Sequence, residues 1–351
     1  MCGPRGLQGE PDHLFHNNGD GTFTDVSAKA GVSDKNRYYG FGAVFADVNG
    51  DGKLDILVAN DSTPRYLYLN RSNGTFADAS LDSGFALNED GREQASMGIA
   101  VGDYRNDATL AAYVTNFSDD YNTLFSNDGK GSFEDLTRSL GIMEPTFPFL
   151  GWGTSFLDFD NDGWQDLVVA NGHVYPGVDQ QPWGTTFAQR PLLMRNLQGK
   201  KFELIPALTG SGLGVPTTGR GLAVADLFND GHLDIVINNL DGHPSLLRNE
   251  VRNRNHWVEF KLVGGGKSPA DGIGASMRLS ARGLGLRRDV ISGGSYESSS
   301  DLRLHFGLGE ADSVTDVEIR WPDGMKQTIS IPAVDRIYVV NQGKSPTEWS
   351  H

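Results

Sequence analysis

Asp158-Phe-Asp160-Asn-Asp162-Gly163-Trp164-Gln-Asp166 is a nine-residue acidic loop with an apolar, strand-like segment on either side. Aspartates occupy its positions 1, 3, 5 and 9, and a glycine occupies position 6. Oxygen ligands at this spacing suit a hard cation such as Ca²⁺, and the glycine permits the sharp turn that aims the position 7 carbonyl inward. The loop therefore predicts a calcium site at the turn of a β-hairpin.

Related loops begin at Asp47, Asp103 and Asp226, so successive loops are 56, 55 and 68 residues apart. A glycine-punctuated apolar segment precedes each loop, a second apolar segment follows it, and further short strand-like segments complete the unit. A period near 50 residues with four strands per unit is typical of propeller blades. We therefore expect an all-β protein whose first part is a β-propeller with four loop-bearing blades.

A leading half blade over residues 14–25 precedes the first complete unit. Four blades are able to close into a ring, but only at the small end of the known range. The other interpretation is that the chain is a fragment of a larger propeller whose first strands belong to missing sequence. Long insertions at 171–190 and 144–149 are expected at a propeller face, either as functional loops or as tolerated surface connections.

Three of the four loops retain enough oxygen ligands for calcium, so we expect about three Ca²⁺ sites. In the fourth loop, Phe228 occupies position 3 and offers no oxygen, so a water or a neighbouring carbonyl must substitute. The imidazole of His232, at position 7, is expected to be exposed rather than metal-bound. The predicted ligands are Asp47, Asn49, Asp51 and Asp55 with the Lys53 carbonyl; Asp158, Asp160, Asp162 and Asp166 with the Trp164 carbonyl; and Asp226, Asp230 and Asp234 with the His232 carbonyl.

The second loop, Asp103-Tyr-Arg105-Asn-Asp107-Ala108-Thr-Leu-Ala111, has lost the acid at position 3, the glycine and the acid at position 9. We predict that it binds no calcium. Arg105 is expected to lie between Asp103 and Asp107, where its guanidinium replaces the cation. The competing interpretation of all four loops is that Asp-Gly and Asn-Gly form turns without metal. Two nearly complete copies at matching places in the repeat favour metal binding.

Composition narrows the class of function. The formal net charge of −15 argues against a nucleic acid partner, because such binding requires a basic surface. No apolar run approaches the roughly 18 residues that a membrane span needs, so membrane insertion is not expected. The single cysteine, Cys2, cannot form an internal disulfide. Loops with few charges work best where calcium is plentiful, which favours an extracellular or periplasmic protein whose signal sequence lies outside this chain.

The repeat pattern stops after Asn249, and alternating strand-like segments begin at His256. We predict an N-terminal loop over residues 1–11, a propeller over 12–252, a small β-sandwich over 253–343 and a tail over 344–351. Pro322-Asp323-Gly324 is expected to form a hairpin turn. Sandwich strands are predicted at 256–263, 275–280, 287–291, 302–306, 314–321, 327–331 and 337–340.

The repeats resemble the FG-GAP, or VCBS, repeats of integrin α-chain propellers and of many secreted bacterial proteins. In the C-terminal part, Asp271-Gly-Ile-Gly-Ala275, Gly293-Gly-Ser295-Tyr, Leu304-His-Phe-Gly-Leu-Gly309 and Arg320-Trp-Pro-Asp-Gly324 resemble the UnbV/ASPIC domain. Together they resemble the cartilage acidic protein family, and this resemblance implies extracellular, calcium-binding roles in cell adhesion or matrix interaction. Family members usually carry more repeats before the segment resembling Cys2-Gly-Pro-Arg-Gly6, which supports the interpretation as a fragment.

No catalytic constellation is recognisable in the sequence. A Gly-x-Ser-x-Gly elbow and a His-Glu-x-x-His pair are both lacking, and His173 and His305 are expected to be structural. We therefore expect a non-enzymatic scaffold for a protein or glycan ligand, with calcium mainly structural. The alternative is a carbohydrate-binding protein or hydrolytic enzyme that uses the propeller face, with Trp152, Trp183 and Tyr175 as a stacking surface.

Overall fold

The computed structural model describes residue 4, residues 6–208 and residues 210–349. Cys2 and part of the predicted N-terminal loop lie outside these residues. Nearly all regular structure is β-strand, as the sequence predicts. The helical segments are single turns: α1 (Ser27–Ala30), α2 (Met143–Thr146), η1 (Val178–Gln180) and η2 (Gly212–Gly214).

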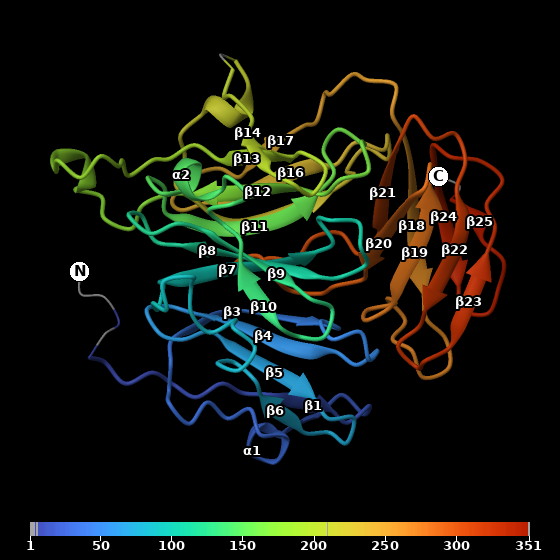
Figure 1. The fold of residues 1–351 in the computed structure, drawn as a ribbon, viewed down its shortest axis with the longest axis horizontal. Helices are drawn as coiled ribbons and strands as arrows, with labels where there is room; N and C mark the ends of the chain where they lie inside the picture. Colours follow the sequence, from blue (N-terminus) through green and yellow to red (C-terminus); the bar gives the residue numbers. More distant parts are fainter. Residues whose placement is uncertain (1–3, 5, 209, 350–351) are drawn as a thin grey trace.

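The propeller part consists of a two-stranded sheet followed by four larger sheets, which we call the first to fourth blades (Figure 1). The leading pair is β1 (Phe15–Asn17) with β2 (Phe23–Asp25). The first blade contains β3 (Gly40–Ala46), β4 (Asp55–Asn60), β5 (Tyr66–Asn70) and β6 (Phe76–Asp78); the second contains β7 (Ser96–Gly102), β8 (Ala111–Asn116), β9 (Thr123–Asn127) and β10 (Phe133–Asp135). The third contains β11 (Gly151–Leu157), β12 (Asp166–Asn171), β13 (Leu192–Asn196) and β14 (Phe202–Leu204); the fourth contains β15 (Gly219–Ala225), β16 (Asp234–Asn239) and β17 (Ser245–Leu247).

Every blade is an antiparallel meander, and the first strands of successive blades pack on one another: β3 on β7, β7 on β11 and β11 on β15. Glycine permits this close approach. A β-carbon on Gly98 of β7 would collide with the carbonyl oxygen of Trp152 in β11, and one on Gly153 would lie 2.5 Å from the Leu222 nitrogen in β15. The glycine punctuation of these segments is therefore explained by crowding between the first strands of neighbouring blades.

The C-terminal part is a sandwich of two four-stranded sheets, which lies to one side of the blades in Figure 1. One sheet has the order β21 (Leu304–Gly309), β18 (His256–Val263), β24 (Arg336–Asn341), β25 (Thr347–Glu348). The other has the order β20 (Leu284–Asp289), β19 (Ser276–Ala281), β22 (Thr315–Arg320), β23 (Lys326–Ile329). The strand β25 lies in the segment that the sequence predicted to be a tail.

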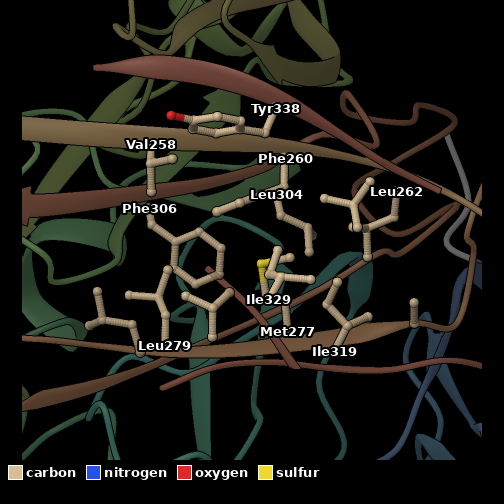
Figure 2. Packing of buried hydrophobic residues seen from close by; sticks show 14 of the residues in the cluster. Val258, Phe260, Leu262, Met277, Leu279, Leu304, Phe306, Ile319, Ile329 and Tyr338 are labelled. Atoms are coloured by element: carbon tan, nitrogen blue, oxygen red, sulfur yellow. The ribbon is translucent and has the colours of Figure 1, made fainter. Parts of the chain in front are cut away.

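A hydrophobic core fills the space between these two sheets (Figure 2). Phe260 and Phe306 meet edge to face with ring centroids 6.0 Å apart, and Met277 and Ile319 approach from the other sheet. The predicted hairpin turn after Trp321 is present, with Gly324 at φ +90° and the Trp321 nitrogen donating to the Met325 carbonyl 2.9 Å away. The sandwich therefore has its own core, separate from those of the blades.

One segment of the sandwich leaves its own sheets and enters the propeller. Residues 292–300, which we call the axial strap, run along the inner strands of all four blades. The strap pairs with β3 at Val44 and with β7 at Ile99. Ser295 Oγ donates to the Leu222 carbonyl in β15 at 2.8 Å and accepts from the Thr154 nitrogen in β11 at 3.1 Å. The strap therefore joins the propeller and the sandwich into one unit.

Candidate metal centres

All four acidic loops connect the first and second strands of a blade, so they lie at the same end of the propeller. We call them the first (47–55), second (103–111), third (158–166) and fourth (226–234) loops. The insertions at 144–149 and 171–190 lie at the opposite end, because antiparallel strands return there. This topology separates the candidate metal sites from the long surface insertions.

A repeated hydrogen-bond pattern shapes the loops. In the third loop, Asp158 Oδ1 and Oδ2 accept from the nitrogens of Asp162 and Gly163 at 3.0 and 2.8 Å. Asp166 Oδ2 accepts from the Phe159 nitrogen at 3.1 Å, and Gly163 adopts φ +93°. The first, second and fourth loops share the bond from the nitrogen at position 6 to the aspartate at position 1. The aspartates therefore organise the turn as well as offering oxygens.

The third loop brings three carboxylates together. Asp158, Asp160 and Asp166 place oxygen atoms within 4.8 Å of one another, and their exposed fractions are 2%, 5% and 0%. Among the described residues this is the one group of three acidic, histidine or cysteine side chains that converges in this way. Asp160 Oδ1 is buried without a hydrogen-bond partner. An all-oxygen donor set with an unused buried oxygen fits a hard cation.

The electrostatics of the third loop also favour a cation. Burial first, and the charge of Asp162 second, raise the pKa of Asp158 to about 8. Burial and the charge of Asp158 raise the pKa of Asp166 well above its ordinary value. Arg195 of β13 supplies a partial counter-charge by pairing with Asp160 and lying 3.6 Å from Asp162. The site therefore holds more negative charge than its protein partners neutralise.

The first loop has a similar but less acidic arrangement. Asp47 Oδ1 is buried and unpartnered, while its Oδ2 accepts from the Gly52 nitrogen at 2.8 Å. Asn49 and Asp51 accept from main-chain nitrogens two residues further on, at 3.1 and 2.8 Å, the second bond coming from Lys53. Burial raises the pKa of Asp55 to about 6. The ligand set predicted for this loop stays a prediction.

The fourth loop orders Asp226 and Asp234 in the same way, through bonds from Gly231 and Leu227. Phe228, at position 3, lies on the surface beneath the guanidinium of Arg248, which is 4.2 Å from the ring centroid. His232 is half-buried and its Nδ1 is enclosed, so the expectation of an exposed imidazole was wrong. The main-chain nitrogen of His232 donates to Asp230 Oδ1 at 3.2 Å.

In the second loop, Arg105 pairs with Asp107, with Nε and Oδ2 2.8 Å apart. Its Nη2 donates to the Asn127 carbonyl at 2.7 Å. The predicted bridge from Arg105 to Asp103 is not formed among the described ion pairs, and the arginine whose charge lowers the pKa of Asp103 is Arg288 of the sandwich. Burial is the stronger effect and raises this pKa to about 6. Ala108 keeps the left-handed conformation of the missing glycine, with φ +64°.

Sequence reasoning missed the asparagines that connect neighbouring blades. Asn127 and Asn196 each end a third strand, and Asn249 lies two residues after the third strand of the fourth blade. Each Nδ2 donates to the carbonyl at position 2 of the preceding blade's loop. The accepting carbonyls belong to Val48, Tyr104 and Phe159, at 2.6, 2.8 and 2.7 Å. Their recurrence in sequence was visible, but recurrence alone does not tell which backbone the side chain reaches.

The two histidines singled out in the sequence have structural roles. Both are buried, and burial lowers their pKa values, that of His305 to about 3. His173 Nδ1 accepts from the Tyr175 nitrogen at 3.1 Å, so its Nε2 carries the proton toward Ser118 Oγ at 3.2 Å. Trp152 is buried with its ring centroid 4.7 Å from that of Tyr296 in the strap, so it offers no stacking surface. Trp183 is 51% exposed.

Comparisons with known families agree with this architecture. Residues 265–347 match the family described as ASPIC and UnbV, and residues 6–58, 47–114 and 110–169 match the FG-GAP-like repeat. The chain therefore carries FG-GAP-like repeats followed by a C-terminal UnbV/ASPIC domain.

Individual proteins show a more distant similarity. Cartilage acidic protein 1 of Homo sapiens is 28% identical over 90% of this chain and 37% of its own length; that of Mus musculus is 28% identical over 88% and 45%. The chain thus spans less than half the length of these curated relatives. A solved structure of an Agrocybe aegerita lectin, described as recognising non-reducing terminal N-acetylglucosamine, is 16% identical over 68% of this chain and 74% of the lectin, with a TM-score of 0.33.

Proposed function

We propose that the protein is a calcium-stabilised, non-enzymatic scaffold for interactions in an extracellular or periplasmic setting. The convergence of Asp158, Asp160 and Asp166, buried and with one unused oxygen, carries this proposal. Calcium suits the site because it takes six to eight oxygen ligands in flexible geometry. Within the described residues, no helix has the length and apolar character that crossing a membrane requires.

Calcium would occupy the first, third and fourth loops, with the ligands assigned from the sequence. Its role would be structural, since each loop is the turn of a hairpin whose grouped carboxylates repel one another without a cation. The second loop would remain metal-free because Arg105 already neutralises Asp107. No residue is assigned to catalysis.

Extracellular calcium concentrations support the assignment of location. Sites with few carboxylates in extracellular modules bind calcium with dissociation constants of roughly 10⁻⁴ to 10⁻³ M. Such sites fill where calcium is in the millimolar range and remain empty in a calcium-poor cytosol. The protein would therefore have its loops occupied only after export.

A protein or glycan partner would bind at the end of the propeller opposite the acidic loops. The sandwich covers the loop end, whereas the far end carries the two insertions, which are linked by the Thr185 hydroxyl donating to the Pro148 carbonyl at 3.0 Å. Phe147 and Trp183 are 41% and 51% exposed there. Aromatic side chains with one exposed face suit contacts with protein or sugar surfaces.

Isothermal titration with Ca²⁺ and metal analysis of the dialysed protein test the calcium assignment. We expect about three bound ions, and loss of one in the double variant Asp158→Asn, Asp160→Asn. The matched control is Asp107→Asn, which changes an acid of the second loop and should keep all three. Failure to bind calcium at millimolar concentration would overturn the assignment.

Glycan and protein arrays, probed with calcium and again after verified chelation, test the partner assignment. We expect binding that Trp183→Ala weakens and that Leu81→Ala, a change at a more exposed apolar residue outside the two insertions, does not. Binding that survives complete metal removal would count against a ligand bridged by metal. Equal loss in both variants would place the partner at another surface.

A further inference from the structure

The C-terminal sandwich binds every acidic loop. Arg320 Nη2 donates to the Asp51 carbonyl of the first loop at 2.9 Å, and Arg287 Nη1 donates to the Ala108 carbonyl of the second at 2.9 Å. The Gly309 nitrogen donates to the Asn161 carbonyl of the third loop at 2.8 Å. In the fourth loop, Arg303 donates to the Asp226 carbonyl at 2.5 Å and to Asn229 Oδ1 at 2.7 Å, and His305 Nε2 contacts the Gly231 carbonyl at 3.1 Å.

These contacts avoid the oxygens that the metal would use. The accepting oxygens are main-chain carbonyls at positions 1, 4, 5 and 6 and the position 4 side chain, whereas the predicted ligands are the side chains at 1, 3, 5 and 9 and the position 7 carbonyl. A loop is therefore able to hold a cation on its inner side and the sandwich on its outer side at the same time. Arg320 Nη1 also lies 3.7 Å from Asp47 Oδ2, one of the predicted ligands.

The docked loops have little freedom to move. A β-carbon on Gly307 would collide with Asp158 Oδ2 and lie 2.6 Å from the Asn161 Cα. One on Gly231 would overlap the indole ring of Trp257. The sandwich thus packs directly on the backbone of the third and fourth loops, so a loop that opens must break these contacts.

Two of these arginines, Arg287 and Arg303, are held in place by acids of the sandwich itself. Arg287 pairs with Asp289 at 2.8 Å and is 5% exposed on its side chain, while Arg303 pairs with Glu259 at 3.0 Å and Asp301 at 2.6 Å. Buried, paired guanidinium groups have fixed positions, so they recognise one arrangement of loop carbonyls. The geometry of the loops then decides how well the sandwich docks.

We propose that the sandwich is a latch whose docking on the propeller depends on calcium binding to the acidic loops. Bound calcium fixes the positions of the loop carbonyls that accept hydrogen bonds from the sandwich. These carbonyls then hold the sandwich and its axial strap on the propeller. This inference rests on the calcium binding proposed above. Without the cation, the grouped carboxylates repel, the loops open and the docking contacts weaken. Coupling between binding and docking is reciprocal, so weaker docking must also lower calcium affinity.

Hydrogen exchange of the intact chain, with calcium and after chelation, measures docking directly. The reporter amides are Gly309, bonded to Asn161, and Ser295 of the strap, bonded to the Ile99 carbonyl. Amides in β19 and β22 report the sandwich interior. We expect calcium to raise protection of the reporter amides by about 5-fold or more, the lower range of typical coupling, and to leave the interior unchanged.

Calcium titration of Arg320→Ala separates the latch from a simple charge effect. Arg320 is 36% exposed on its side chain, so its removal should be compatible with folding. If Arg320 acted only as a competing positive charge near Asp47, its removal would tighten calcium binding, whereas the latch requires weaker binding. Arg282→Ala, which removes an exposed arginine paired with Glu310, is the matched control and should not change affinity.

Every result of the hydrogen-exchange and calcium-titration experiments either supports or overturns the latch. Raised reporter protection together with weaker calcium binding in Arg320→Ala supports the latch. Calcium binding without a change at the reporter amides, tighter binding in Arg320→Ala, or equal loss of protection in the sandwich interior overturns the latch and leaves the calcium assignment standing. Absence of calcium binding overturns both.

Discussion

The third and second loops differ in how they compensate the same aspartates. The third loop gathers Asp158, Asp160 and Asp166 around an unused oxygen, which a mobile cation is able to satisfy. The second loop keeps Asp103 and Asp107 but places Arg105 against one of them and Arg288 near the other. Both loops nevertheless form the same turn, because main-chain nitrogens donate to the first aspartate in each of them.

Removal of a third-loop ligand should produce the largest difference between the loops. At calcium concentrations about 100-fold above the dissociation constant, one site adds about 2.7 kcal/mol to the free energy of unfolding. We expect Asp160→Asn to remove an increment of about this size, and Asp107→Asn to leave the increment intact. Denaturant unfolding with calcium and with chelator measures both; equal losses would erase the distinction between the loops.

Asn196 connects the two loops that are compared. Its Nδ2 donates to the Tyr104 carbonyl of the second loop at 2.8 Å and to the Gln165 carbonyl of the third at 2.9 Å. We expect Asn196→Ala to lower the free energy of unfolding by about 2 kcal/mol, because it leaves buried carbonyls unpaired. Chemical denaturation after chelation is the measurement, since the clamp acts without metal. A loss of stability seen only with calcium would assign Asn196 to the metal site instead.

Ala108 gives a smaller effect of opposite sign. It occupies the glycine position of the loop at φ +64°, a conformation that costs a non-glycine residue roughly 1 kcal/mol. We expect Ala108→Gly to raise the free energy of unfolding by up to about 1 kcal/mol without creating a calcium site, because positions 3 and 9 still lack acids. Thermal unfolding and calcium titration check the two parts. A newly bound ion would show that the glycine alone had been limiting.

Arg105 should give the smallest effect. Its ion pair with Asp107 is partly exposed, at 32% and 42% of the two side chains, and such pairs contribute about 0.2 to 1 kcal/mol. We expect Arg105→Gln to destabilise the protein by less than about 1 kcal/mol, and by less in high salt. Denaturation at two ionic strengths measures this. A loss above about 2 kcal/mol would mean that Arg105 is the main support of the loop.

Much of the fold was predictable because its determinants are local and repeated. The period of the loops, the glycines of the inner strands and the turn at Pro322-Asp323-Gly324 each follow from short-range geometry, and the structure confirms them. Candidate ligands could be named for the same reason, although their roles stay predictions. The half-buried His232 and the charge of Arg288 near Asp103 could not be predicted, because both depend on residues far away in the chain.

By itself, the sequence determined that the chain forms repeated four-stranded units with acidic turns, followed by a separate β-sandwich. These features depend on the alternation of side chains along a strand and on the residue types of each turn, which are local properties of the chain. Only the tertiary structure decided that Arg287, Arg303 and Arg320 meet the loops and that residues 292–300 contact the first strands of all four blades. The physical reason is that these contacts join main-chain carbonyls to side chains roughly 75 to 270 residues away, and a carbonyl has no sequence signature.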